Sequence, residues 1–74
     1  MARERLKNAR QKAGMTQQQV ADTLGISLRY YKQIESGQRT GDFVIWDTLE
    51  EVTGIHQRIL REIVENYPDK EDSQ

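Results

Sequence analysis

The feature that most constrains this chain is the stretch from Thr16 to Gly37, TQQQVADTLGISLRYYKQIESG. It contains two short helix patterns separated by a turn at Gly25. Each pattern begins with a hydroxyl residue, Thr16 or Ser27, which can accept a hydrogen bond from the free amides of a first helical turn. Gln19 follows Thr16 at the spacing of a capping box. The stretch therefore predicts a helix-turn-helix.

Both predicted helices have one apolar face, so both can pack on a common core. The inward-facing residues are Val20, Ala21, Leu24, Tyr31 and Ile34. The opposite face of the second helix carries four long side chains, which are Leu28, Arg29, Lys32 and Gln33. Arginine and lysine suit guanine O6 and N7, glutamine suits adenine N6 and N7, and leucine can contact a thymine methyl group. This face predicts direct reading of base edges in a major groove of DNA, with an ordinary solvated helix face as the alternative.

Three further helices are expected around this pair. Residues 3–12 predict a first helix with Leu6, Ala9 and Ala13 on its inner side, and Asp42 can cap a fourth. A fifth is expected over residues 56–66. The apolar residues of the last two helices are expected to pack mainly in the core, and these are Phe43, Ile45, Trp46, Leu49, Val52, Ile59, Leu60, Ile63, Val64 and Tyr67. Candidates for a dimer interface among them are Trp46, Ile59, Ile63 and Tyr67.

No alternating pattern predicts a strand, so we expect an all-α fold, a compact five-helix bundle. Its domain is expected to span residues 1–67 and to be followed by a short charged tail, residues 68–74. A domain of this size has little surplus for an enzyme cleft and is marginally stable alone, which dimerisation would improve.

The charge is unevenly distributed along the chain. Residues 1–41 contain eight Lys or Arg against three acidic residues, whereas residues 42–74 contain three against nine, giving the overall net charge of −1. A basic front half beside an acidic back half suggests a surface with one side turned towards phosphate. Ordinary solvation of helices is the alternative explanation.

Several classes of function are disfavoured. The chain has no cysteine and a single histidine, His56, at an expected helix start without a nucleophile or carboxylate motif beside it. We therefore expect neither an enzyme nor a metal site, and no cofactor. No stretch approaches the roughly 20 apolar residues of a membrane span, and the first residues lack the apolar segment of a signal peptide, so a cytoplasmic protein is expected.

The runs TQQQVADTLGIS and YYKQIESGQR resemble the DNA-binding domain of the lambdoid phage repressor and Cro family, also called the Xre-type helix-turn-helix family. The resemblance covers about residues 6–55. It implies a five-helix bundle whose third helix enters the major groove, and homodimers that bind palindromic operators. Carried over by position, the base-reading residues are Leu28, Arg29, Lys32 and Gln33. The implied phosphate-contacting residues are Thr16, Gln17, Ser27, Tyr30, Arg39 and Thr40, with capping or loop roles as rivals for Thr16 and Thr40.

The resemblance also implies a structural salt bridge between Arg10 and Glu35, which would remove Arg10 from the DNA contacts. The chain departs from the family after Gly37, because many members have a proline soon after the third helix and this chain continues RTGDFVIWDTLEEVTGIH. The path of the loop that follows the third helix is therefore not implied by the resemblance.

We accordingly expect a transcriptional regulator of the phage, plasmid or bacterial type, a repressor that binds double-stranded DNA as a homodimer. The alternative is a protein-interaction module, such as an antitoxin or a regulator-binding partner, that uses the neighbourhood of Leu28, Tyr30 and Tyr31 to bind another protein. DNA binding predicts that Arg29, Lys32 and Arg39 are all needed and that affinity falls steeply with salt. A protein partner predicts dependence mainly on apolar residues.

Overall fold

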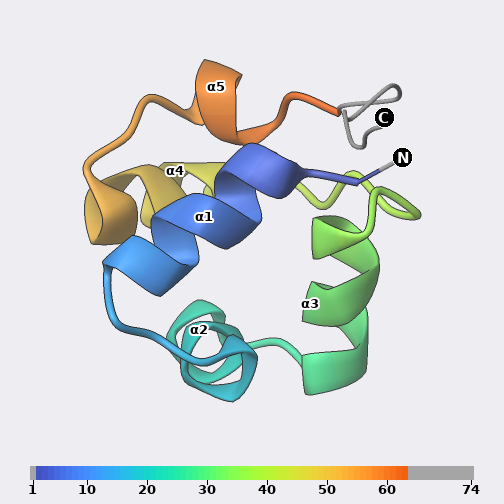
Figure 1. Cartoon of the computed structure of the whole chain (residues 1–74). Helices are drawn as coiled ribbons and strands as arrows, with labels where there is room; N and C mark the ends of the chain where they lie inside the picture. The colour runs from blue at the N-terminus through green and yellow to red at the C-terminus, as the bar shows by residue number, and fades with distance from the viewer. Residues whose placement is uncertain (1, 64–74) are drawn as a thin grey trace, which may run out of the picture.

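The computed structural model describes residues 2–63, which form five helices and no strand (Figure 1). The helices are α1 (Glu4–Lys12), α2 (Gln17–Leu24), α3 (Leu28–Glu35), α4 (Phe43–Thr53) and α5 (Gln57–Leu60). The prediction of an all-α five-helix fold is confirmed. Helices α2 and α3 pack against each other, and α1 contacts α3, α4 and α5. None of these helices is both long and apolar enough to cross a membrane.

The helices begin where the capping residues of the sequence indicated. Thr16 accepts a hydrogen bond from the amide of Gln19 at 3.1 Å, and the Gln19 side chain accepts one from the Thr16 amide at 2.8 Å, so the capping box is complete. Ser27 and Asp42 each accept a hydrogen bond at 3.1 Å from the amide three residues on. Between α2 and α3, Gly25 adopts a φ of 72°, which only glycine enters readily.

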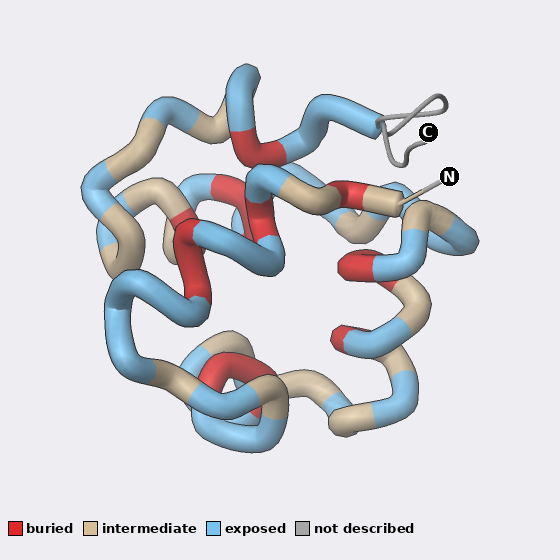
Figure 2. Tube along the Cα trace, viewed as in Figure 1, coloured by how far each residue is buried: buried red, intermediate tan, exposed pale blue. Residues whose placement is uncertain are grey.

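The core is assembled from all five helices. Its ten buried apolar residues are Leu6, Ala9, Val20, Ala21, Tyr31, Ile34, Ile45, Trp46, Leu49 and Leu60. Figure 2 shows that buried segments, in red, occur along all five helices and alternate with exposed segments, in pale blue. Met15, Leu24, Ile26 and Ile55 are partly buried and pack against this core. The inner faces predicted for α2 and α3 are therefore confirmed.

Two residues expected to face inward from α1 and α4 are exposed. Ala13 lies past the last turn of α1, at the point where the chain turns away from the core. Phe43 is 71% exposed and its neighbour Val44 is 63% exposed. The reason is the 100° rotation per residue of an α-helix, since the buried face of α4 is set by Ile45, Trp46 and Leu49 and this places Phe43 and Val44 on the other side.

The fifth helix is shorter than the predicted residues 56–66. It ends at Leu60, and the amide of Glu62 bonds the carbonyl of Ile59 at 3.2 Å instead of continuing the α-helical pattern. The carbonyl of Arg61 is engaged by the Arg3 guanidinium at 3.1 Å, which draws the chain out of the helix. Three predicted features lie outside the described residues: the end of this helix, residues 64–66, then Tyr67, and the tail, residues 68–74.

The residues predicted as candidates for a dimer interface differ in their exposure to solvent. Trp46 is 1% exposed in the core and is not available to a partner, so its candidacy was wrong. Ile59 and Ile63 are 43% and 39% exposed, so the expectation that they pack mainly in the core was wrong too. Both remain accessible to a second copy.

Candidate nucleic-acid interface

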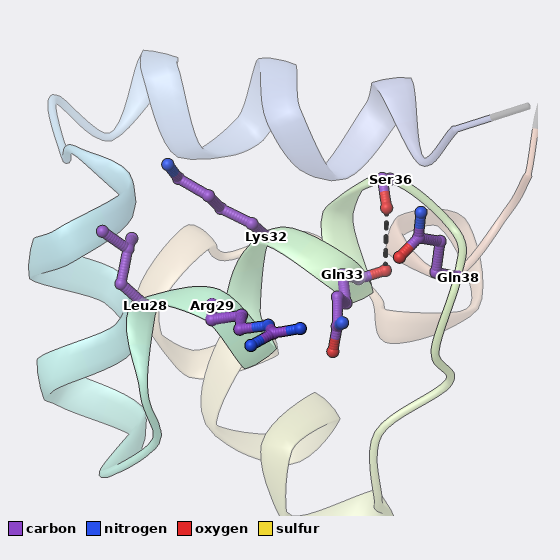
Figure 3. Close-up of a pocket in the computed structure, with 6 residues that line it drawn as sticks. All are labelled: Leu28, Arg29, Lys32, Gln33, Ser36 and Gln38. Atoms are coloured by element: carbon purple, nitrogen blue, oxygen red, sulfur yellow. Dashed lines mark hydrogen bonds between the residues drawn. The ribbon is translucent and has the colours of Figure 1, made fainter.

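The exposed face of α3 gathers the four residues that the sequence singled out. Leu28, Arg29, Lys32 and Gln33 line one shallow surface groove, which Ser36 and Gln38 extend beyond the end of the helix (Figure 3). Arg29 and Lys32 are exposed, and Leu28 and Gln33 are half-buried. The groove thus combines two cations, amides and one apolar side chain on a single helix face.

The two cations of this groove keep their donors available. Among residues 2–63 the ion pairs are Arg5 with Glu62 and Arg10 with Glu35, so neither Arg29 nor Lys32 is neutralised by a carboxylate there. A guanidinium can bind two acceptors side by side, whereas an ammonium is a compact point charge. This arrangement suits an anionic ligand whose own groove is wide enough to admit α3 and displays hydrogen-bond acceptors there.

Most of the predicted phosphate contacts lie at helix starts and in the loop after α3, and none of them is among the residues that line this groove. Thr16 and Ser27 use their oxygen atoms to cap α2 and α3, which leaves each hydroxyl hydrogen free to donate. The first turn of α2 also has backbone amides without intrahelical partners, a favourable environment for an anion. Arg39 and Thr40 are exposed in the loop between α3 and α4. These residues have donors of the kind that bind phosphate.

Gln17 leans on α3 through its side-chain amide. Its Nε2 donates to Glu35 Oε1 at 2.9 Å, and the second hydrogen of that amide remains for another acceptor. Tyr30 is half-buried and packs against the core. Its neighbour Tyr31 is fully buried, so the suggestion that Tyr31 belongs to an exposed protein-binding face was wrong.

The Glu35 carboxylate ties α1, α2 and α3 together beneath the groove. Arg10 Nε donates to its Oε2 at 2.8 Å, Tyr31 Oη donates to the same oxygen at 2.7 Å, and Gln17 occupies Oε1. The hydrogen bond to Glu35 raises the pKa of Arg10. Burial, followed by the hydrogen bond to Glu35, raises the pKa of Tyr31 well above its ordinary value. Arg10 is thus held inside the structure, with its Nη1 donating to the Met15 carbonyl at 2.9 Å.

Several residues around the groove were not found from the sequence. Ser36 lies one turn beyond Lys32 and Gln33, so the helical period could have identified it. Gln38 follows in a loop, where no period applies. Lys7 of α1 lines a second depression together with Gln17 and Lys32, which extends the basic surface to a third helix. The sequence could not predict that Lys7 lies near Gln17 and Lys32, because this depends on how α1 packs on α3.

A family model described as helix-turn-helix (HTH_3) matches residues 6–56 of the chain. Comparison with curated proteins and with solved structures gives no match. The matched residues include α2, the Gly25 turn, α3 and the loop that follows, and they make up more than half of the chain. The chain therefore belongs to the Cro/C1-type, Xre-like helix-turn-helix family, which is one of DNA-binding regulators.

Proposed function

We propose that this protein is a transcriptional repressor that binds double-stranded DNA with α3 in the major groove. The observation that supports this most is the α3 groove itself, where Arg29 and Lys32 stand without carboxylate partners among residues 2–63. In this proposal Leu28, Arg29, Lys32 and Gln33 read base edges. Phosphates are contacted by Thr16, Gln17, Ser27, Tyr30, Arg39 and Thr40.

We infer that the protein acts as a homodimer on an inverted repeat. Dimers of helix-turn-helix proteins bind half-sites about 34–36 Å apart, one turn of B-DNA, so the dimer would present its two α3 helices at that spacing. Exposed apolar side chains are available for such an interface, and these are Phe43, Val44, Ile59 and Ile63. Sedimentation velocity at several concentrations tests the dimer, and a monomer at every concentration, with and without DNA, would refute it.

The test of the function is selection from a randomised duplex pool, followed by anisotropy titration of the selected sequence at several salt concentrations. We expect an enriched inverted repeat, and Arg29→Ala should lower the affinity by about 10- to 100-fold, the equivalent of about 1–3 kcal/mol for a bidentate base contact. Lys12→Ala is the matched control, because it also removes one positive charge. Lys12 is exposed beside Ile55 and Ile59 and does not line the α3 groove. No enrichment over nonspecific binding at low salt would refute the proposal.

A protein-interaction role is the second candidate, and the exposed pair Phe43 and Val44 favours it. Adjacent apolar side chains at a helix start are suited to burial against another protein. Such binding would depend on these two residues and change little with salt, whereas DNA binding by α3 would weaken strongly as salt rises. The Arg29→Ala variant distinguishes the two, since it should weaken DNA binding and leave binding through Phe43 and Val44 almost unchanged.

A further inference from the structure

Arg3 is buried against the end of α3, although it lies outside the helix-turn-helix and precedes α1. It is 4% exposed, and its backbone amide donates to the Glu35 carbonyl at 2.9 Å. Its guanidinium carbon lies 5.2 Å from the centre of the Trp46 ring, in the range of a cation–π contact. Burial, together with the nearby charge of Arg61, lowers the pKa of Arg3.

A buried guanidinium needs acceptors, and Arg3 has no carboxylate partner among residues 2–63. It binds backbone carbonyls of three segments instead. Its Nη1 donates to the carbonyls of Ile34 at 2.6 Å and of Arg39 at 2.8 Å, and its Nε donates to the Arg61 carbonyl at 3.1 Å. The Ile34 carbonyl belongs to the last turn of α3 and also accepts a hydrogen bond from the Gly37 amide at 3.1 Å. One planar group therefore joins the end of α3 to the loop that follows it.

Trp46 adds a second restraint to the same loop. Its Nε1 donates to the Thr40 carbonyl at 2.8 Å, so the carbonyls of two consecutive loop residues are each held by a side chain from another segment. The loop contains no proline that would restrict its backbone, because the single proline of the chain is Pro68. The side chains of Arg39 and Thr40 nevertheless remain exposed. The backbone is fixed while the donors face solvent.

We propose that Arg3 is a positioning residue for DNA binding, which holds the loop of Arg39 and Thr40 at a fixed place relative to the end of α3. The inference rests on the proposed function of the α3 groove. A loop that is already ordered loses little conformational entropy when it meets phosphate, so its contacts contribute more to affinity. Arg3 itself is not expected to touch DNA in this arrangement, because it is 4% exposed and its Nε and Nη1 donors bind protein carbonyls.

The first test uses Arg3→Lys, which keeps the charge but cannot present a planar fork to several carbonyls. With the selected duplex, we expect roughly tenfold weaker binding. The negative slope of log affinity against log salt should become shallower by about 0.9, the value of one phosphate contact. In an Arg39→Ala background, Arg3→Lys should weaken binding by less than about twofold, since the charged contact that it positions is already lost and only the neutral Thr40 contact remains. Arg5→Lys is the control, because Arg5 is exposed on the neighbouring turn.

The second test needs no DNA. Hydrogen exchange is measured at the amides of Gln38 and Arg39, which bond the Gln33 carbonyl at 2.9 and 3.1 Å. We expect at least about fivefold faster exchange in Arg3→Lys relative to core amides of the same variant, and no change in Arg5→Lys. Trp46→Phe removes the donor to Thr40 and also shrinks a buried ring, so its exchange is likewise compared with core amides of the same variant. It should have a similar effect and serves where Arg3→Lys does not fold.

The outcomes separate the two proposals. Failure of the wild-type protein to select any duplex refutes the proposed function, and the exchange experiment still decides whether Arg3 orders the loop. Unchanged exchange at Gln38 and Arg39 in the folded variants overturns the inference. Additive losses from Arg3→Lys and Arg39→Ala, or an unchanged salt slope, overturn it too, because a residue that only stabilises the fold gives these results.

Discussion

The ion pair between Arg10 and Glu35 allows a quantitative prediction, because the chain has a matched exposed pair in Arg5 and Glu62. The side chains of the first pair are 10% and 8% exposed and those of the second are 58% and 57% exposed. Removing one partner of a buried pair leaves an uncompensated charge, which typically costs about 3–5 kcal/mol. We expect about 3 kcal/mol for Arg10→Met, at the lower limit because Tyr31 and Gln17 still donate to the carboxylate.

This loss is large relative to the stability of such a domain. At about 0.05–0.15 kcal/mol per residue, a chain of this length has a free energy of unfolding of roughly 4–11 kcal/mol. The corresponding decrease in Tm is about 12–24 °C. Breaking the exposed pair with Arg5→Met should cost less than about 1 kcal/mol, since water solvates whichever charge remains.

The assay is urea unfolding followed by circular dichroism and by the fluorescence of Trp46, the only tryptophan. A double-mutant cycle of Arg10→Met with Glu35→Gln should give a coupling of about 2 kcal/mol, with an unchanged m value. The same cycle on Arg5→Met with Glu62→Gln should give less than about 0.5 kcal/mol. Equal couplings at the two pairs would refute the reasoning, because burial would then not decide the strength of the interaction.

Three further predictions concern stability and pH. Tyr31 binds its proton more tightly in the folded protein than in the unfolded chain, so its contribution to stability should be constant below about pH 10 and fall by about 1.4 kcal/mol per pH unit above it. Urea titrations between pH 8 and 11 should show this fall reduced in Tyr31→Phe but not in Tyr30→Phe. Gly25→Ala should cost about 1–2 kcal/mol, because a Cβ there has free space and only the positive φ is unfavourable. Gly41→Ala should cost more in the same thermal unfolding experiment, since its Cβ would also lie 3.1 Å from Ile34 Cδ1, and equal costs would contradict this. Thr16→Ala should cost about 1 kcal/mol through the lost cap, and a loss below about 0.3 kcal/mol in urea unfolding would show that the cap contributes little.

Local features of the sequence predicted most of the helix-turn-helix. The caps at Thr16, Ser27 and Asp42 bond amides within their own first turns, and Gly25 supplies a backbone conformation that other residues avoid. Such interactions extend over three or four residues, so sequence spacing alone identifies them. The same holds for the exposed face of α3, because a period of 3.6 residues determines which side chains share a face.

Predictions that concerned packing between distant segments were less accurate. Apolar character alone suggested that Phe43 would be buried, but the orientation of α4 is set by Ile45, Trp46 and Leu49 on its other side. The fifth helix was predicted too long for a related reason, since the Arg61 carbonyl is bound by a residue near the other end of the described chain.

The sequence by itself thus determined the helix starts, the turn and the side chains displayed on α3, because these depend on contacts between near neighbours. Only the tertiary structure decided that Arg3 lies buried over Trp46 and that Lys7 lies beside Gln17 and Lys32. Both depend on how α1 and the chain before it pack against residues 10–43 positions away in the sequence. An arginine that binds backbone carbonyls has no motif of its own, since every residue supplies the same carbonyl group and only the fold brings three of them together.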